Sequence, residues 1–483
     1  MIFNSITFAI FLSIVFVLYW FVFNRNLKLQ NILVLVASYV FYGWWDWRFL
    51  SLIFISSCSD YLIGYLINRQ NKNNQRKLLL LLSLAINLGL LGFFKYYNFF
   101  MGSLIEAFLG MGIQLHESTL SIILPVGISF YTFQTLSYTI DIYRRKLEPT
   151  HDVISFFAFV SFFPQLVAGP IERASQLLPQ FEKSRVFDRV KAKDGLRQIL
   201  WGLIKKVVIA DTLSIQVDNI FNATSYSTMP GVLLFIGSLL FTFQIYCDFS
   251  GYSDIAIGTA RLFGFDLMQN FAYPFFSRNI GEFWQRWHIS LSTWFRDYVF
   301  IPLGGSRVTT WGLVRNILIT YMVSGLWHGA NWTYIVWGFL NGLFYLPLLL
   351  LKGKGKYSKI VAFNKILPNI KETLQMIFTF SLFSFSMIFF RSDSIERSFS
   401  FIFNLFNNIG LNAAISMDWI LSKSLILVLL LTIVEWVQRK RHHVLEIDSY
   451  PVSLRWSVYL ISLGIFIYFG EFESTKQFIY FQF

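Results

Sequence analysis

The sequence predicts an all-α integral membrane protein that crosses the bilayer many times. Hydrophobic residues make up 55% of its 483 residues and charged residues only 14%, which leaves too little polar side chain to cover a soluble globule of this size. The mean hydropathy is +0.54. Apolar runs able to cross or deeply enter roughly 30 Å of hydrocarbon recur along the chain, and about eleven or twelve can be counted as spans. They lie near residues 6–23, 31–45, 49–67, 78–97, 120–140, 197–214, 231–247, 311–327, 332–351, 373–390, 424–437 and 454–469.

The net charge of +13 could indicate a nucleic-acid partner. The lysines and arginines, however, fall in short connectors between the hydrophobic runs, a pattern that fixes orientation in a bilayer. We therefore expect no nucleic-acid role and place the basic connectors on the cytoplasmic side. These connectors are residues 68–77, 143–146, 352–371 and 439–443.

The first hydrophobic run, Ile6–Phe23, is expected to be retained as a membrane span. It has no basic segment before it and no small-residue cleavage site, and the cations Arg25 and Lys28 follow it. This arrangement predicts an N-terminus outside the cytoplasm. The two cysteines, Cys58 and Cys247, lie in apolar surroundings, so neither a disulfide framework nor a cysteine metal cluster is expected.

Two segments do not fit a simple series of spans. The apolar stretch 153–169 has basic connectors on both sides, so we expect it to enter the membrane from the cytoplasm and return. Pro164, Gly169 and Pro170 should break its backbone where protein or a water-filled cavity satisfies the freed groups. Residues 248–307 are too polar for a lipid-facing span and too aromatic for a solvated loop. Short or tilted helices packed inside the protein are expected there.

His328 is the first candidate functional residue. Between Arg315 and Lys352 it is the only Asp, Glu, Lys, Arg or His in an almost wholly apolar stretch. An imidazole in such a place loses hydration and needs partners, and ionisable residues within membranes commonly mark functional sites. Trp327 and Asn331 are nearby side chains that can form hydrogen bonds. On spacing alone, a core histidine bonded to a neighbouring helix explains the residue equally well.

His288 is the second candidate, because the other four histidines are expected to be solvated: His116, His151, His442 and His443 lie in polar or basic connectors. Two histidines in an aromatic, lipid-embedded setting could form a proton relay, a metal pair or an acid/base site. A metal is the weakest of these options, because no carboxylate or cysteine stands at helical ligand spacing beside either histidine. No metal site is therefore expected.

Several charged residues near the histidines have a structural explanation. Glu282 and Arg286 stand four residues apart, a spacing that favours an ion pair on a helix. Arg296 and Asp297 could pair with other groups, and ion pairing in a region that cannot leave charges bare is favoured over a catalytic role. Arg307 follows a Gly-Gly turn and would suit an anionic group, but the sequence has no glycine-rich phosphate loop.

Six motifs together resemble one family, and they span most of the chain. They are GISFYTFQTLSYTIDIY at 127–143, FPQLVAGPI at 163–171, YCDFSGYSD at 246–254 followed by RLFGF at 261–265, EFWQRWHISLSTWFRD at 282–297, IPLGGSR at 301–307 and GLWHGANW at 325–332. This combination is similar to the membrane-bound O-acyltransferases. It is most similar to the bacterial branch that contains alginate and peptidoglycan O-acetyltransferases and the teichoic acid D-alanyl-transfer proteins. The IPLGGSR element looks more like the acetyltransferases.

The resemblance implies a single membrane domain over residues 1–483, in which about eleven tilted helices, with re-entrant and interfacial helices, form a ring around a central tunnel. His328 corresponds to the family's active-site histidine and His288 to the second histidine. An acyl donor, expected to be acetyl-CoA, would enter from the cytoplasm as a substrate, with no bound cofactor. The residues expected to support the site or bind substrate are Asn331, Trp327, Trp287, Ser292, Arg296, Asp297, Asp248 and Arg307.

The tail at residues 470–483 ends in FIYFQF, which resembles the C-terminal motif of this acyl-transfer branch. By that resemblance Tyr480 would carry the acyl group as an ester until a separate extracytoplasmic acyltransferase of the SGNH type takes it. The basic connector before the last span places this tail outside. Without the motif, an aromatic anchor at the membrane interface would be the preferred interpretation of Tyr480.

The sequence therefore predicts a multi-pass O-acetyltransferase of the bacterial cytoplasmic membrane. It would move an acetyl group from a cytoplasmic thioester toward a cell-envelope or secreted polysaccharide. Peptidoglycan is the first choice of acceptor, with alginate or another exopolysaccharide second, and D-alanyl transfer to teichoic acid is a further alternative. From a different class, a proton-coupled transporter would also use two intramembrane histidines.

Overall fold

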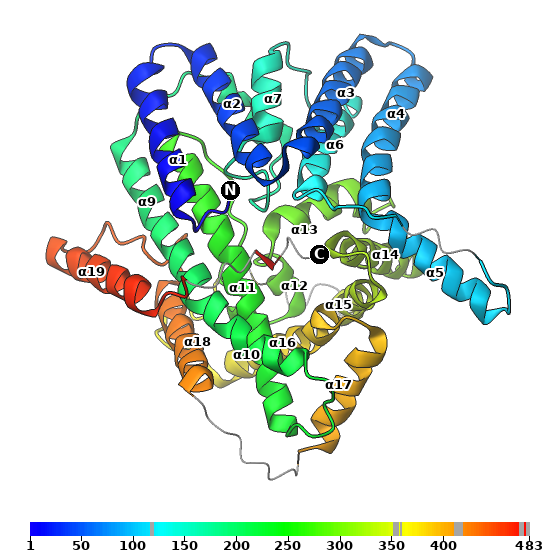
Figure 1. Ribbon diagram of the computed structural model, residues 1–483, viewed down its shortest axis with the longest axis vertical. Coiled ribbons are helices and arrows are strands. Elements are labelled where there is room, and N and C mark those ends of the chain that lie inside the picture. The colour runs from blue at the N-terminus through cyan, green and yellow to red at the C-terminus, as the bar shows by residue number, and fades with distance from the viewer. Residues whose placement is uncertain (116–119, 351–356, 358–359, 410–418, 473–477, 480–483) are drawn as a thin grey trace. The chain divides into compact units, whose positions relative to one another are not determined.

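The computed structural model describes residues 1–115, 120–350, 357, 360–409, 419–472 and 478–479. Every regular element in these residues is a helix, as the expected all-α class requires (Figure 1). The chain forms two compact units. The first comprises Met1–Gly195 with Thr259–Met268, and the second comprises Leu196–Gly258 with Gln269–Phe483.

In the first unit, α3, α4 and α6 pack against one another, and α2 packs against α7 (Figure 1). Its helices are α1 (Ile6–Val17), η1 (Leu18–Val22), α2 (Leu27–Asp46), η2 (Trp47–Phe49), α3 (Leu50–Arg69), α4 (Asn73–Leu91), η3 (Gly92–Tyr96), α5 (Tyr97–Gly110), α6 (Ile128–Tyr143), α7 (Val153–Ser161) and α8 (Ala174–Phe181).

A buried polar cluster joins α3, α4 and α6. Asp60 is fully buried on α3. One of its carboxylate oxygens accepts a hydrogen bond from Ser83 Oγ at 2.6 Å, and the other accepts one from Asn87 Nδ2 at 2.8 Å. Thr139 Oγ1 lies 3.1 Å from Ser83 Oγ, and Thr135 Oγ1 donates to Asn87 Oδ1 at 3.3 Å. Both carboxylate oxygens thus have partners, as a buried carboxyl group requires.

The break expected after residue 153 is confirmed. Asp152 caps α7 by accepting from the backbone N–H groups of Ile154 and Ser155. The helix ends at Ser161, before Pro164, and residues 162–173 continue as a buried segment without an α-helix. The surrounding protein satisfies part of this backbone, as expected, because Phe163 N donates a hydrogen bond to Ser38 Oγ at 3.0 Å. Whether the segment re-enters the membrane from the cytoplasm stays a prediction.

The second unit contains the region in which the two histidines were predicted to act. Helix α9 (Arg189–Leu203) passes from the first unit into the second. The further helices are η4 (Ile204–Ala210), α10 (Asp211–Phe221), α11 (Gly231–Leu262), η5 (Pro274–Phe276), α12 (Ile280–Trp284), α13 (Ile289–Phe295), η6 (Arg296–Phe300), α14 (Thr310–His328), α15 (Trp332–Leu350), α16 (Ile370–Arg391), α17 (Ile395–Asn407), α18 (Trp419–Gln438) and α19 (Val452–Phe469).

Helix α11 corrects the expected irregular region. The sequence suggested a span that ends at residue 247 and short helices from 248, but the helix continues without interruption to Leu262. Its charged residues do not end it because they are paired inside the protein. Asp248 pairs with Lys206, and Asp254 pairs with Lys205 at 2.6 Å. Short helices do form further along, in α12, α13 and η6.

Seven helical stretches among the described residues are long and apolar enough to cross a membrane. The multi-pass character of the chain is therefore confirmed. Four runs expected to span are not among the seven, because their helices are too short or too polar: 6–23, 120–140, 197–214 and 311–327. The ring of about eleven helices stays a prediction. The seven stretches are Leu27–Arg69, Asn73–Gly110, Gly231–Leu262, Trp332–Leu349, Ile370–Arg391, Ile420–Gln438 and Val452–Phe469.

Candidate active site

His328 is the last residue of α14, where the chain turns into α15 (Figure 1). Two glycines, Gly325 before His328 and Gly329 after it, allow this turn. A Cβ atom at Gly325 would collide with the carbonyl oxygen of Tyr334, and one at Gly329 would collide with the Tyr334 ring. Only glycine therefore lets the start of α15 lie so close to the end of α14. The GLWHGANW motif thus has a packing reason, and the packing fixes the position of His328.

Aromatic rings surround the His328 imidazole, which is only 4% exposed. The ring centroids of Trp327 and Trp337 each lie 5.0 Å from that of His328, and the centroid of Phe390 lies 5.3 Å away. All three contacts are edge-on. The three rings therefore shield the imidazole from water.

His288 adopts a left-handed backbone conformation, with φ of 44°, immediately before α13. Such a conformation costs free energy for a residue other than glycine and occurs frequently at functional sites. Asn270 stabilises it. The Asn270 carbonyl accepts from Ile289 N at 2.9 Å, and the Asn270 side-chain oxygen accepts from Ser290 Oγ at 2.9 Å.

The same amide oxygen determines which nitrogen of His288 carries the proton. His288 Nδ1 lies 3.2 Å from Asn270 Oδ1, while Asn270 Nδ2 donates to Ser253 Oγ at 3.0 Å. Because Asn270 Oδ1 can only accept, Nδ1 must donate. Nε2 of the neutral ring then holds a lone pair, and it has no hydrogen-bond partner among the described residues. A buried acceptor nitrogen of this kind is suited to receive a proton.

The electrostatic setting keeps His288 neutral. Burial lowers the pKa of His288 well below its ordinary value, and the nearby His328 lowers it further. His288 is 1% exposed, and its ring centroid lies 6.3 Å from that of His328 and 6.0 Å from that of Trp327. The structure thus brings together the two predicted histidines and Trp327, in a site where both imidazoles are held away from water.

Three other predicted residues support the site without lining it. Trp287 is buried next to His288 in the chain, with its ring packed on Phe383 at a centroid distance of 4.9 Å. Ser292 Oγ donates to the Trp287 carbonyl at 3.3 Å, within the turn that begins α13. Asn331 Nδ2 donates to the Asp393 carbonyl at 2.8 Å. These side chains fix backbone segments around the histidines.

The structure places the remaining charged residues away from the histidines' immediate contacts. Arg296 Nε donates to Asp297 Oδ1 at 2.8 Å, and the Arg296 side chain is largely exposed. Arg307 is exposed. The ion pair expected between Glu282 and Arg286 is confirmed at 2.6 Å. Structural pairing therefore accounts for the charges of EFWQRWHISLSTWFRD, as the sequence favoured.

The prediction that His443 is solvated is wrong, because it is 2% exposed. It lines a polar pocket together with Lys205, Asp254 and Glu435. The basic connector folds against the protein instead of extending into water. His442 is exposed, as expected.

Tyr480 lies outside the described residues, but the two residues before it are well buried. Phe478 is 1% exposed, and its ring packs on Tyr252 and Phe249 at centroid distances of 4.7 and 5.7 Å. Ile479 N donates to Asp248 Oδ2 at 2.8 Å. Phe249 in turn packs edge-on against His288 at 4.5 Å. The tail therefore contacts the same aromatic ring as the second histidine.

Sequence reasoning missed three residues of this arrangement. Asn270, Phe249 and Lys206 were not predicted, although Phe249 lies within the YCDFSGYSD motif. Asn270 follows a short stretch of mixed polarity that shows no periodicity, so nothing in the sequence connected it with a residue eighteen positions away. Within the described part of the chain, no group of three His, Cys, Asp or Glu side chains could hold a metal ion.

Comparison with known proteins assigns the chain to a family. Residues 144–390, which include both histidines, match the profile of the membrane-bound O-acyltransferase family. The chain belongs to this family and is a multi-pass membrane acyltransferase.

Three relatives illustrate its range. The chain is 40% identical over 398 residues to the probable alginate O-acetylase AlgI of Pseudomonas aeruginosa, covering 82% of this chain and 73% of the relative. It is 34% identical over 417 residues to the peptidoglycan O-acetyltransferase of Helicobacter pylori, covering 81% and 76%. It is 28% identical over 244 residues to the teichoic acid D-alanyltransferase of Bacillus subtilis, covering 48% and 60%.

Proposed function

We propose that this protein is an O-acetyltransferase that moves an acetyl group from a cytoplasmic thioester, acetyl-CoA, to Tyr480 on the outer side of the membrane. The observation that carries the proposal is the convergence of two buried imidazoles and the C-terminal tail. His288 and His328 lie with ring centroids 6.3 Å apart, and Phe478 and His288 pack on the same ring, that of Phe249.

The chemistry assigned to the histidines is general base catalysis. The hydroxyl oxygen of Tyr480 attacks the thioester carbonyl carbon, and His328 takes the hydroxyl proton. The carbon–sulfur bond then breaks, the thiol sulfur leaves with a proton returned from the imidazole, and the acetyl group remains as an ester on Tyr480. A neutral imidazole can perform both proton transfers. His288 orients the reacting groups or passes the proton, with Nε2 as its free acceptor.

The acetyl group then leaves Tyr480 for a polysaccharide with the help of an extracytoplasmic partner acyltransferase of the SGNH type. This arrangement requires the tail that carries Tyr480 to lie outside the cytoplasm, and we propose the same side for the N-terminus. The similarity to alginate O-acetylases is greater than that to the peptidoglycan O-acetyltransferase. We therefore place a secreted polysaccharide ahead of peptidoglycan, which reverses the order preferred from the sequence.

A donor experiment tests this function. Membrane vesicles that hold the protein are given radiolabelled acetyl-CoA on the cytoplasmic side, and label on the protein and on added polysaccharide is measured. We expect label on both when the partner acyltransferase is present. Tyr480→Phe keeps the aromatic ring but removes the hydroxyl, so label should disappear from both.

Unchanged polymer acetylation in Tyr480→Phe would refute the tyrosine relay. Labelling by a D-alanyl carrier-protein thioester instead of acetyl-CoA would favour the teichoic acid alternative. A transporter would move a solute without transferring label, and membership of the acyltransferase family already argues against that class.

A further inference from the structure

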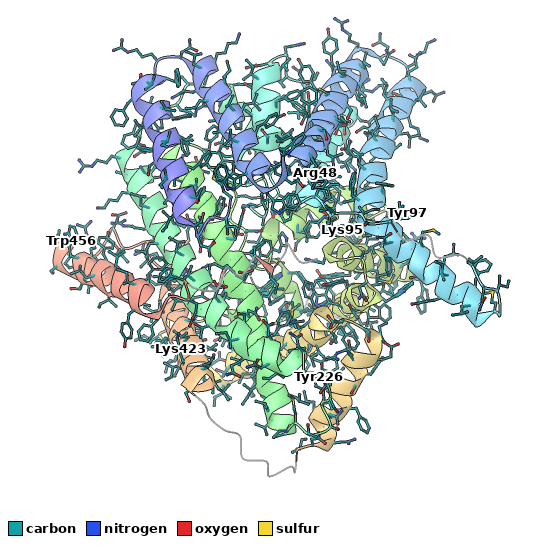
Figure 2. The ribbon with its side chains drawn as sticks, viewed as in Figure 1. Arg48, Lys95, Tyr97, Tyr226, Lys423 and Trp456 are labelled. Carbon is teal, nitrogen blue, oxygen red and sulfur yellow. The ribbon has the colours of Figure 1, made fainter. Side chains whose placement is uncertain are left out.

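The chain that follows α19 is fixed to η4 near the start of the tail. Glu471 N donates to the Val207 carbonyl at 3.1 Å. The Glu471 carboxylate also accepts from Lys423 Nζ at 2.8 Å, and Figure 2 labels this lysine on α18. The segment toward Tyr480 therefore starts from a fixed point.

A second fixed point lies at Ile479, the residue before Tyr480. It involves Lys206, which is next to Val207 in η4. Ile479 N donates to Asp248 Oδ2, as described above. The other oxygen of Asp248 pairs with Lys206 Nζ at 2.7 Å, and Lys206 also pairs with Asp211 at 2.8 Å. The side chains of Lys206 and Asp248 are 7% and 4% exposed. Two adjacent residues of η4, Lys206 and Val207, thus hold the two ends of the segment.

Helix η4, which takes part in both fixed points, is one of four π-helices among the described residues, a form that often occurs at functional sites. Burying charges is costly unless each is paired, and buried ion pairs are weak evidence for a gain in stability. Here the buried carboxylate accepts a backbone N–H of the tail, and hydrogen bonds to charged acceptors are stronger than neutral ones.

We propose that Asp248, held in place by Lys206, is a positioning residue that clamps the backbone of the tail at Ile479 so that Tyr480 is presented to the histidine site. The inference rests on the proposed function of Tyr480. The hydrogen bond to Asp248 fixes the backbone at Ile479, so the hydroxyl of the next residue, Tyr480, no longer moves freely. Misplacing a reacting group by about 1 Å can slow a reaction roughly 100-fold.

The sharpest variants change the tail and leave the helix core intact. Ile479→Pro removes the N–H that Asp248 accepts, whereas the matched control Ile479→Ala keeps it. On the other side of the bond, Asp248→Ala removes the acceptor and Asp248→Asn keeps one oxygen for it. Asp254→Ala is the control for loss of a buried ion pair, because Asp254 lies on the same helix and pairs with the lysine next to Lys206.

The measurement is the rate at which Tyr480 becomes acetylated in the full-length protein supplied with acetyl-CoA, followed by mass spectrometry of the C-terminal peptide. We expect Ile479→Pro and Asp248→Ala each to slow acetylation roughly 100-fold, with an unchanged KM for the donor. The double variant should be no slower than either single variant, because both remove the same bond. Asp248→Asn should recover part of the rate, and the two controls should change it less than about threefold.

A second readout does not depend on activity. Carboxypeptidase digestion of the intact protein should stop before Ile479 in the wild type and in Ile479→Ala, but proceed past this position in Asp248→Ala, which frees the tail without placing a proline in the path of the enzyme. Wild-type acetylation rates in Ile479→Pro, or additive losses in the double variant, would overturn the clamp. If instead Tyr480 is never acetylated in the wild type, the proposed function fails and the digestion pattern alone decides whether the clamp exists.

Discussion

The two units each contain a buried polar cluster, and the clusters differ in whether their hydrogen bonds are complete. In the first unit, both oxygens of Asp60 accept from side chains of α4. In the second unit, Nδ1 of His288 forms a hydrogen bond with Asn270 Oδ1, whereas Nε2 of His288 has no hydrogen-bond partner among the described residues. A saturated buried cluster holds helices together, whereas a buried nitrogen with a spare lone pair is available to a substrate. Burial alone therefore does not identify an active site.

Removal of a site imidazole should give the largest loss of activity. We expect His328→Ala to reduce acetyl transfer by about 10²–10⁴-fold, the range typical for loss of general base catalysis. The protein should remain folded, because the residue lies at the end of α14 and not within it. The rate is measured in vesicles with labelled acetyl-CoA, and His442→Ala, which changes an exposed histidine, is the control. Activity close to wild type in His328→Ala would remove this residue from the mechanism.

The reverse pattern is expected for the saturated cluster. Asp60→Leu removes the carboxylate acceptor from the Ser83 hydroxyl and from the Asn87 amide, and a buried polar group left without its partner costs about 1–3 kcal/mol. The thermal midpoint in detergent should fall, while the rate per folded molecule stays the same. Glu148→Ala, at an exposed position, serves as the control. A rate loss in Asp60→Leu as large as that of His328→Ala would contradict the assignment of a purely structural role to the Asp60 cluster.

A smaller effect is expected from the residue that orients His288. Asn270→Ala removes the acceptor of the Nδ1–H bond, and one hydrogen bond contributes about 0.5–1.5 kcal/mol, so transfer should slow by roughly tenfold at most. Asn341→Ala, which removes another buried amide of the second unit, should leave the rate near wild type. Equal rates for the two variants would contradict the assigned role of Asn270.

The smallest expected effect is on the pH dependence of stability. The pKa of His288 is lowered in the folded protein, so below an unfolded-state pKa of about 6.5 the unfolded chain binds the proton more readily. The contribution of neutral His288 to stability is therefore present above that pH and lost as the pH falls. Wild type should lose more stability than His288→Gln between about pH 7 and pH 5.5. Identical pH profiles in chemical unfolding would contradict the lowered pKa.

The sequence predicted the membrane class and both histidines, because isolated polar residues in apolar runs and a rare combination of motifs are local signals. It also predicted the helix break at Pro164, since proline acts through its own backbone. It did not predict the continuation of α11 past Asp248, because that depends on lysines more than forty residues earlier in the chain. Asn270 and the burial of His443 were missed for the same reason. Tertiary partners determine both, and one sequence does not reveal them.

The central claim is that the buried histidine site transfers an acetyl group to the tail of its own chain. Cleavage after Lys476 releases the peptide 477–483, in which Tyr480 is the only residue with a side-chain hydroxyl. Mass spectrometry of this peptide, after incubation of the protein with acetyl-CoA, tests the claim directly. We predict the added mass of one acetyl group on Tyr480 in the wild type and its absence in His328→Ala. An unmodified peptide in wild-type protein that still acetylates polysaccharide would contradict the account.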